Sequence, residues 1–288
     1  MFNGFVFVDT IDLITQPDLS EKYFIDKYGN IPKYLICFYQ MQEKDFHLVV
    51  EKLCPSISVV LFIDDIHHGP DHMGTRTQVI QSSKINFFTY GYVLDKSLYP
   101  KIPNNYFLPH SAQWIIGFNP NPINKILISG RVSDIYPDRK YLINLAKKTK
   151  SKFDVLKCNV PYRGVISESD IFGKNYYEYL NKYICCFVDT PRDYIVAKNF
   201  EICAGGSLLL CANSQLIDVY DKLGFVDGFN YISCSMSNIC EKIDWILNPA
   251  NLNQVNKIRL SGQELIKKLH TSSKRYDKVL EILNDFDK

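Results

Sequence analysis

The 288-residue sequence contains no run of about 18 apolar residues, so we expect no transmembrane helix. Its first residues, Met1–Phe5, lack a basic segment, so we expect no signal peptide. None of its nine cysteines forms a Cys-x-x-Cys pair, and they are scattered through apolar segments. We therefore expect reduced, buried thiols in a cytoplasmic protein rather than a disulfide framework.

The sequence also has little net charge, +2 in total, which gives no strong attraction to nucleic acid or to a membrane surface. No internal repeat of fixed period and no low-complexity segment is present. A hydrophobic content of 46% with 22% charged residues is typical of a globular protein. At this length we expect one large or two small domains, each with its own core.

Short apolar runs alternate with segments of helical spacing, which predicts an α/β protein with parallel sheets. The expected strands are 5–8, 34–39, 57–63, 85–90, 105–109, 125–129, 153–157, 183–188, 207–211 and 230–234. The expected helices are 43–53, 74–83, 92–99, 137–150, 173–182, 195–204, 214–223, 236–247, 252–268 and 271–286. The segment 9–32, which contains Pro17 and Gly29, is expected to be irregular. The turn-rich stretch 119–122 (Asn-Pro-Asn-Pro) predicts a domain boundary, which divides the chain into domains 1–118 and 119–288.

The segment 193–211 is the centre of the second domain. Lys198 and Glu201 lie three residues apart, on the polar side of the expected helix. Gly205-Gly206 is expected to end that helix in the left-handed conformation, before the strand that starts at Ser207. We therefore predict that a cation and a carboxylate lie at the carboxyl edge of a parallel sheet, where ligands usually bind.

This segment resembles the donor-sugar site of GT-B glycosyltransferases, particularly the group-1/family-4 type and the CgeB-like proteins. In those families a basic residue precedes Phe-Glu, then come small residues, a glycine and an apolar strand, as here from Lys198 to Cys211. Further matches are Gly130-Arg131, Tyr136-Pro137-x-Arg139, the loop 225–231, Gly262, His270-Thr271 and Arg275. The resemblance covers roughly residues 125–286. It implies two Rossmann-like domains facing a central cleft, with C-terminal helices closing the chain and the nucleotide-sugar donor on the second domain.

The resemblance also implies roles for single residues. Glu201 would contact the donor ribose, and Asp193, eight positions earlier, would lie near the sugar, although the family usually has Glu there. Arg131 and Lys198 would stabilise the charge of the departing diphosphate. The remaining expected donor-binding residues are Gly130, Tyr162, Arg163, Gly205, Gly206 and Ser207, the last three through backbone amides that approach the donor.

Each of these residues also has an ordinary structural interpretation. Glu201 could be a surface residue paired with Lys198, and the two glycines could form a helix C-cap. The cations Arg131 and Lys198 could be solvated surface residues. Arg139, inside a helix, is expected to be structural rather than part of the donor site.

A cluster of Asp and His residues, 64–72, follows the strand 57–63. Asp64, Asp65, His67 or His68 could orient or deprotonate an acceptor hydroxyl, a role suited to a His with a pKa near neutrality. The same residues could bind Zn or Mn, or simply form a polar loop that caps a helix. We expect no obligatory metal, although a divalent metal remains an alternative.

The sequence therefore predicts a glycosyltransferase that moves a sugar from a nucleotide-diphosphate-sugar to the hydroxyl of a glycan or small glycoside. One alternative is a nucleotide- or glycan-binding protein that has kept the fold without turnover, as the short first domain suggests. Another is a metal-dependent hydrolase built on residues 64–72.

Overall fold

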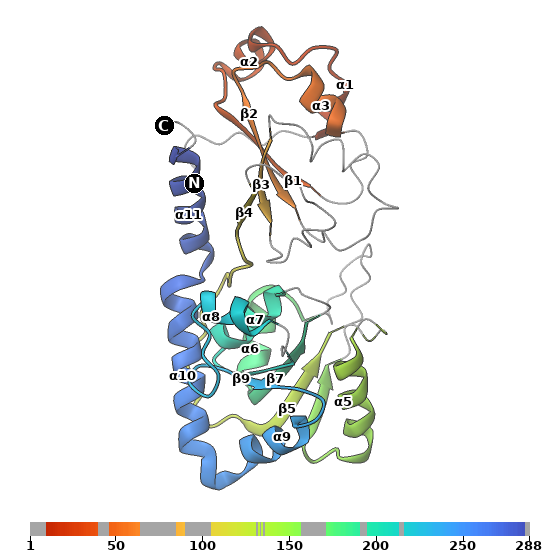
Figure 1. The fold of residues 1–288 in the computed structure, drawn as a ribbon, viewed down its shortest axis with the longest axis vertical. Coiled ribbons are helices and arrows are strands. Elements are labelled where there is room, and N and C mark those ends of the chain that lie inside the picture. The colour runs from red at the N-terminus through yellow and green to blue at the C-terminus, as the bar shows by residue number, and fades with distance from the viewer. Residues whose placement is uncertain are drawn as a thin grey trace. The chain divides into compact units, whose positions relative to one another are not determined.

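The computed structural model shows two compact units, Met1–Pro109 and His110–Lys288, each built around a parallel sheet (Figure 1). It describes residues 10–39, 46–63, 85–89, 105–130, 132, 134, 136–156, 171–190, 195–212 and 216–285. The expected α/β class is confirmed. No helix in these described ranges is long and apolar enough to cross a membrane.

The first unit contains a four-stranded sheet in the order β1-β2-β3-β4. Its strands are β1 (Tyr34–Tyr39), β2 (Ser58–Ile63), β3 (Ile85–Thr89) and β4 (Asn105–Phe107), and its helices are α1 (Thr10–Thr15), α2 (Glu21–Tyr28) and α3 (Phe46–Lys52). These four strands were expected, and α3 lies within the expected helix 43–53. The expected strand 5–8 and helices 74–83 and 92–99 lie outside the described residues.

The prediction that segment 9–32 is irregular was wrong, because α1 and α2 lie within it. The Ser20 hydroxyl accepts a hydrogen bond from Tyr23 N (3.4 Å) and so caps the start of α2. Gly29, read as a helix breaker, is instead the C-cap in the left-handed conformation (φ 79°). The Lys52 ammonium donates to the carbonyls of Ile14 and Gln16, which fixes the end of α1 on α3.

The second unit contains a five-stranded, fully parallel sheet in the order β6-β5-β7-β8-β9. Its strands are β5 (Ile123–Ser129), β6 (Phe153–Leu156), β7 (Tyr183–Asp189), β8 (Leu208–Ala212) and β9 (Ile232–Cys234). Its helices are α5 (Pro137–Lys148), α6 (Gly173–Asn181), α7 (Ala197–Ala204), α8 (Ile217–Lys222), α9 (Ile239–Leu247), η2 (Pro249–Asn251), α10 (Leu252–Leu269) and α11 (Ser272–Asp285). Every strand and helix expected after residue 122 is present, within about three residues at each end.

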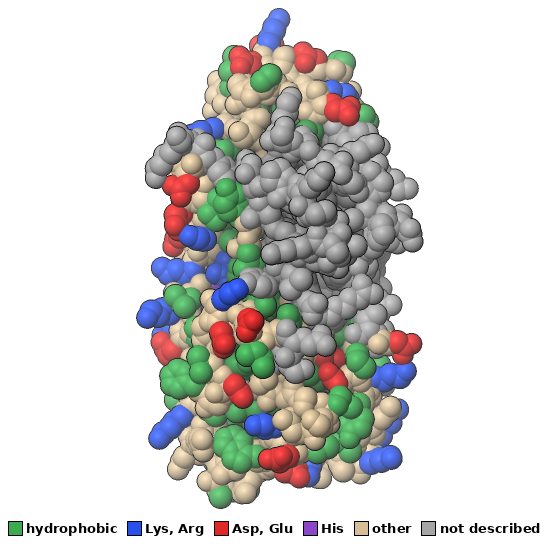
Figure 2. Space-filling model, in the orientation of Figure 1, with side chains coloured by type: hydrophobic (Ala, Val, Ile, Leu, Met, Phe, Trp, Pro, Cys, Tyr) green, Lys and Arg blue, Asp and Glu red, His purple; other side chains and the backbone are tan. Residues whose placement is uncertain are grey.

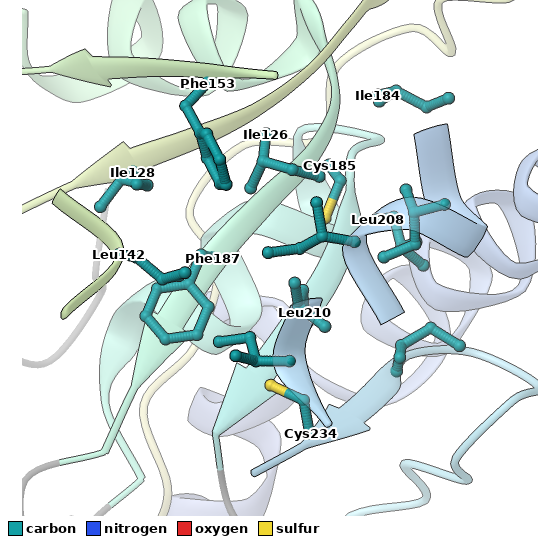
Figure 3. Packing of buried hydrophobic residues seen from close by; sticks show 14 of the residues in the cluster. Ile126, Ile128, Leu142, Phe153, Ile184, Cys185, Phe187, Leu208, Leu210 and Cys234 are labelled. Atoms are coloured by element: carbon teal, nitrogen blue, oxygen red, sulfur yellow. The ribbon is translucent and has the colours of Figure 1, made fainter. Parts of the chain in front are cut away.

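The core of the second unit lies between this sheet and helices α5, α9 and α10 (Figure 3). All seven residues of β7 are buried, as expected for a central strand of a parallel sheet. Phe187 and Leu210 contribute side chains from neighbouring strands to the cluster, and Leu142 contributes from α5. Side chains alternate along a strand, so Cys186 and Leu209, which are equally buried, face the other side, where α6 and α7 pack.

The units divide between Pro109 and His110, so the stretch before the expected boundary at 118/119 belongs to the second unit. Buried polar side chains of α10 hold this stretch. Arg259 donates to the carbonyl of Asn119 (2.9 Å), and Gln263 donates to the carbonyl of Ile116 (2.8 Å). The Arg259 guanidinium also lies over the Phe118 ring, 4.6 Å from its centroid.

The surface in Figure 2 fits the small net charge of the sequence. On this face, Lys and Arg side chains are scattered among Asp and Glu side chains over the described parts of the chain. Exposed ion pairs of the described residues include Lys152–Asp244 (2.5 Å) and Lys140–Asp134 (2.7 Å). Such exposed pairs contribute little to stability.

Candidate functional site

The strand order of the second unit places a topological switch point between β5 and β7. The chain goes from β5 to one side, to β6, and then returns to the other side, to β7 and β8. The loops that leave the carboxyl ends of β5 and β7 therefore diverge, and ligands of open α/β sheets bind in the crevice between such loops. β5 ends at Ser129 and is followed by Gly130, and β7 ends at Asp189.

Gly130 lies at this switch point with a backbone conformation that favours glycine (φ 111°). A Cβ atom added at Gly130 would lie 2.7 Å from Lys198 Nζ and 2.8 Å from an Arg139 guanidinium nitrogen. A side chain at this position would therefore displace one of the two cations. The absence of a side chain lets both cations approach the end of β5.

Lys198 belongs to the first turn of α7, and its ammonium reaches across to β5. Lys198 Nζ donates to the Ser129 carbonyl at 2.8 Å. The sequence placed Lys198 with Glu201 on one polar helix face, and the contact across the sheet edge could not be read from that spacing. Lys198 lies at the carboxyl edge of the sheet, as expected.

Arg139 and Asp189 form a buried ion pair at the same place. Arg139 NH2 lies 2.5 Å from Asp189 Oδ1, and the two side chains are 5% and 2% exposed. The backbone N–H of Arg139 donates to Asp189 Oδ2 at 2.9 Å, and the guanidinium lies over the Tyr136 ring. Arg139 was expected to be structural, and Asp189 was not among the expected site residues.

Glu201 lies one turn further along α7 and is half-buried. Burial raises the pKa of its carboxyl group above the usual value, and the positive charge of Lys198 partly offsets that rise. Burial also raises the pKa of the Tyr177 phenol to about 12, with a contribution from the charge of Glu201. This carboxylate makes no side-chain hydrogen bond or ion pair with the described residues. Glu201 is therefore a partly desolvated carboxylate without a hydrogen-bonding partner in the described part of the chain.

Gly205, Gly206 and Ser207 lie at the opposite, amino edge of the sheet, since β8 begins after them. Their three amide groups donate to the carbonyls of Glu201, Cys203 and Ile202, respectively. The Ser207 hydroxyl lies 2.5 Å and 2.8 Å from two carbonyl oxygens, those of Leu180 and Tyr183. The expectation that these amides approach a donor is not supported, because each already has a partner inside the chain. The helix C-cap is confirmed, with Gly206 rather than Gly205 in the left-handed conformation.

A buried polar network that the sequence did not reveal fixes the start of α7. The Asn199 side-chain oxygen accepts from the Tyr220 hydroxyl at 2.6 Å, and its amide donates to the Val196 carbonyl at 2.9 Å. Cys211 Sγ lies 2.9 Å from the same hydroxyl. Asn199 and Tyr220 are fully buried. The network connects α7 with α8 and the end of β8, but Asn199 in a Lys-Asn-Phe-Glu run gives no signal of this in the sequence.

Several expected site residues lie outside the described residues, namely Asp64, Asp65, His67, His68, Arg131, Tyr162, Arg163 and Asp193. Their roles stay predictions. Within the described part of the chain, no group of three or more His, Cys, Asp or Glu residues could hold a metal ion. That finding does not cover the cluster 64–72, which lies outside the described residues.

The sequence matches no family model and no curated protein. Solved structures do match. The pneumococcal O-GlcNAc transferase GtfA, in complex with UDP and GlcNAc, has a TM-score of 0.54 at 10% identity, over 83% of this chain and 54% of that one. Anabaena Alr3699/HepE, in complex with UDP and glucose, gives 0.62 at 7% identity over 88% and 78%. A glycosyltransferase from Rickettsia africae gives 0.61 at 11% identity over 92% and 79%.

These likenesses establish the fold, and the chain has the α/β fold of GT-B glycosyltransferases with parallel sheets. The chain spans about half the length of the pneumococcal enzyme.

Proposed function

We propose that this protein is a glycosyltransferase that moves a sugar from a nucleotide-diphosphate-sugar to a hydroxyl group of a glycan or small glycoside. The observation that carries the proposal is the switch point, where Lys198 lies against Gly130 and Glu201 lies one helical turn away. The fold shared with known glycosyltransferases, two of them solved with UDP, supports the same proposal.

The departing diphosphate would be bound at the start of α7. An α-helix N-terminus presents N–H groups and a partial positive charge, both of which favour a phosphate. Lys198 adds a full positive charge in the first turn of that helix. Charge builds up on the diphosphate as the sugar leaves, so these groups would stabilise the transition state more than the bound donor.

Glu201 would bind the nucleotide ribose. A carboxylate has two oxygen atoms and can accept hydrogen bonds from both ribose hydroxyls. Its partial burial makes those bonds stronger than they would be in water, because the local dielectric is lower. Arg131, Tyr162 and Arg163 would add contacts to the phosphates or the base, because each is expected to follow a strand of the second domain.

The acceptor would be handled by the first unit. His67, His68, Asp64 or Asp65 would orient the acceptor hydroxyl or take its proton, and Asp193 would lie near the transferred sugar. We propose no obligatory metal, since Lys198, Arg131 and the start of α7 would supply the positive charge. Activity should then survive treatment with a chelator such as EDTA.

The proposal is tested by incubating the purified protein with UDP-, GDP- and dTDP-sugars and measuring thermal stabilisation and nucleoside diphosphate release. Glu201→Gln should lower release by about tenfold, because a neutral amide is a weaker acceptor for the ribose hydroxyls than a carboxylate. The matched control is Glu178→Gln, an exposed carboxylate on α6 paired with Lys174. Undiminished release in Glu201→Gln would overturn the assigned site.

Two other results would support the alternatives. Stabilisation by a nucleoside diphosphate without transfer or hydrolysis, across a broad acceptor panel, would indicate a binding protein on the same fold. Stoichiometric Zn or Mn in the purified protein, with activity lost on chelation, would favour a metal-dependent hydrolase built on residues 64–72.

A further inference from the structure

Two helices begin near the switch point, and each could receive an anion. Helix α5 follows β5, and α7 follows β7. Both strands end at the carboxyl edge of the sheet, and each helix N-terminus carries partial positive charge. A donor diphosphate has two phosphates, so the site must specify which helix receives them.

The N-terminus of α5 is already occupied by a carboxylate of the protein. Asp189 Oδ2 accepts the backbone N–H of Arg139, the third residue of α5, at 2.9 Å. The residue at the N-cap position, Tyr136, makes no side-chain capping hydrogen bond. Asp189, from the neighbouring strand β7, therefore caps α5 in place of a local Ser, Thr or Asp.

The pKa of a second carboxyl group in the same turn responds to the charge of Asp189. The pKa of the Asp138 carboxyl is raised, first by burial and then by the negative charge of Asp189. A phosphate at this end of α5 would meet the same repulsion. It would also have to displace a carboxylate that is only 2% exposed and already bonded to Arg139.

Among the described residues, the N-terminus of α7 differs from that of α5. Its N-cap residue is Val196, whose side chain cannot accept a hydrogen bond. Its first turn carries Lys198. The polar anchor of this turn, Asn199, is neutral and turns its side chain into the buried network with Tyr220.

We infer that Asp189 is a positioning residue that decides where the donor diphosphate lies. It fills the anion position of α5 and holds the Arg139 guanidinium beside Gly130, so the diphosphate is received at α7 instead. This inference rests on the proposed function for its consequence in catalysis, but the occupied anion position of α5 can be tested separately.

The separate test is chemical rescue. Asp189→Ala should lower the melting temperature, because it leaves Arg139 buried without its counter-ion. Formate, a carboxylate small enough to enter the vacated space, should raise the melting temperature of Asp189→Ala well above its value in chloride. The wild type and the control Asp244→Ala, which removes an exposed acid paired with Lys152, should not respond. An equal response of all three proteins to formate would overturn the inference.

The catalytic test uses Asp189→Ala, assayed at a temperature where it is folded, because this variant removes both the charge and the oxygen that accepts the Arg139 N–H. We expect kcat to fall at least tenfold while stabilisation by the best nucleoside diphosphate is retained or increased, because α5 then competes for the phosphates. A merely structural role would lower binding and turnover together, and that result would overturn the inference. If the wild type neither binds nor turns over any nucleotide-sugar, the proposed function fails, and formate rescue still decides whether Asp189 fills the α5 position.

Discussion

The two ends of α7 differ in how their polar groups are used. At its start, Lys198 bonds the end of β5 at the switch point, and the half-buried Glu201, one turn later, has no hydrogen-bonding partner among the described residues. At its end, the amides of Gly205, Gly206 and Ser207 all donate to carbonyls of the chain. A helix of eight residues thus separates the polar groups that we propose bind the donor from polar groups that hold the fold.

The difference shows that one sequence motif, residues 198–207, can combine groups proposed for ligand binding with groups that stabilise the fold. The Gly-Gly-Ser part of the motif fixes α7 on its neighbours, since α6 and α10 supply donors to its carbonyls. Asn181 donates to the Gly205 carbonyl, and Arg259 donates to the Gly206 carbonyl at 3.0 Å. The two ends should therefore respond differently to substitution.

Lys198→Met should separate the two ends most strongly. We expect nucleoside diphosphate release to fall by about 10²–10³-fold, because a positive charge next to the developing charge is lost. Stability should change by only about 1 kcal/mol, for the lost hydrogen bond to Ser129. Steady-state kinetics and thermal unfolding measure the two effects. The control is Lys174→Met, an exposed lysine on α6, and equal losses in both variants would contradict the prediction.

The pH dependence of stability should reveal the structural surroundings of α7 through His270, whose ring lies 5.2 Å from the Phe200 ring. Burial, and then Arg275, lower the pKa of His270 to about 4, so the folded ring is neutral where the unfolded ring binds a proton. The contribution of this neutral ring to the free energy of unfolding is complete above a pH of about 6.5. It is lost as the pH falls toward about 4, by about 3 kcal/mol in total.

Chemical denaturation at several pH values between 4 and 7.5 measures this loss. His270→Gln, which can still donate to the Leu223 carbonyl that His270 contacts at 2.7 Å, should flatten the profile. A profile in His270→Gln as steep as that of the wild type would assign the pH dependence to other groups.

Ser207→Ala should show the opposite behaviour to Lys198→Met. We expect a loss of about 1–3 kcal/mol in the free energy of unfolding, because buried carbonyls at the amino edge lose their hydroxyl partner. Turnover at a temperature where the variant is folded should match the wild type. The exposed hydroxyl of Ser237 provides the control, Ser237→Ala. A tenfold loss of turnover in Ser207→Ala would place this end of α7 in the donor site after all.

The smallest effect concerns donor binding as the pH changes. The pKa of Glu201 is raised by burial, and ribose hydroxyls donate to its ionised form. The Kd of the best nucleoside diphosphate should therefore rise by several-fold as the pH falls through that raised pKa. Lys198→Met removes the charge that lowers this pKa, so its profile should move to higher pH. Calorimetric titrations between pH 5 and 8 measure the profiles, and Glu201→Gln should remove this component.

The fold of the second unit could be predicted from the sequence because its elements are marked locally. The run Tyr183–Val188 is apolar throughout and became most of the central strand β7, and Pro137 opened α5 as expected. The prediction for segment 9–32 was wrong because Gly29 was interpreted as a residue that breaks helices within an irregular region. Gly29 is instead the C-cap that follows the last residue of α2.

The site could be predicted only in part, because its contacts join distant positions. The spacing of three between Lys198 and Glu201 suggested a pair, yet Lys198 bonds Ser129, 69 residues away. Asp189 and Arg139 are 50 residues apart, and neither belongs to a local pattern that marks the other. Helix period and glycine placement predict an element and its end, but not which strand terminus a side chain reaches.

The contacts that hold residues 112–119 against α10 and its C-terminal end determine where the chain can be divided into fragments. A donor-side fragment that starts at residue 119 would leave the guanidinium of Arg259 without the Phe118 ring and Gln263 without the Ile116 carbonyl. It would also lose the two backbone hydrogen bonds that Ala112 makes with His270 and Ser272. These bonds hold the residues around Ala112 against the junction of α10 and α11. A fragment beginning at His110 keeps all of these bonds, and it is the one to express when nucleotide binding is to be measured without the first unit.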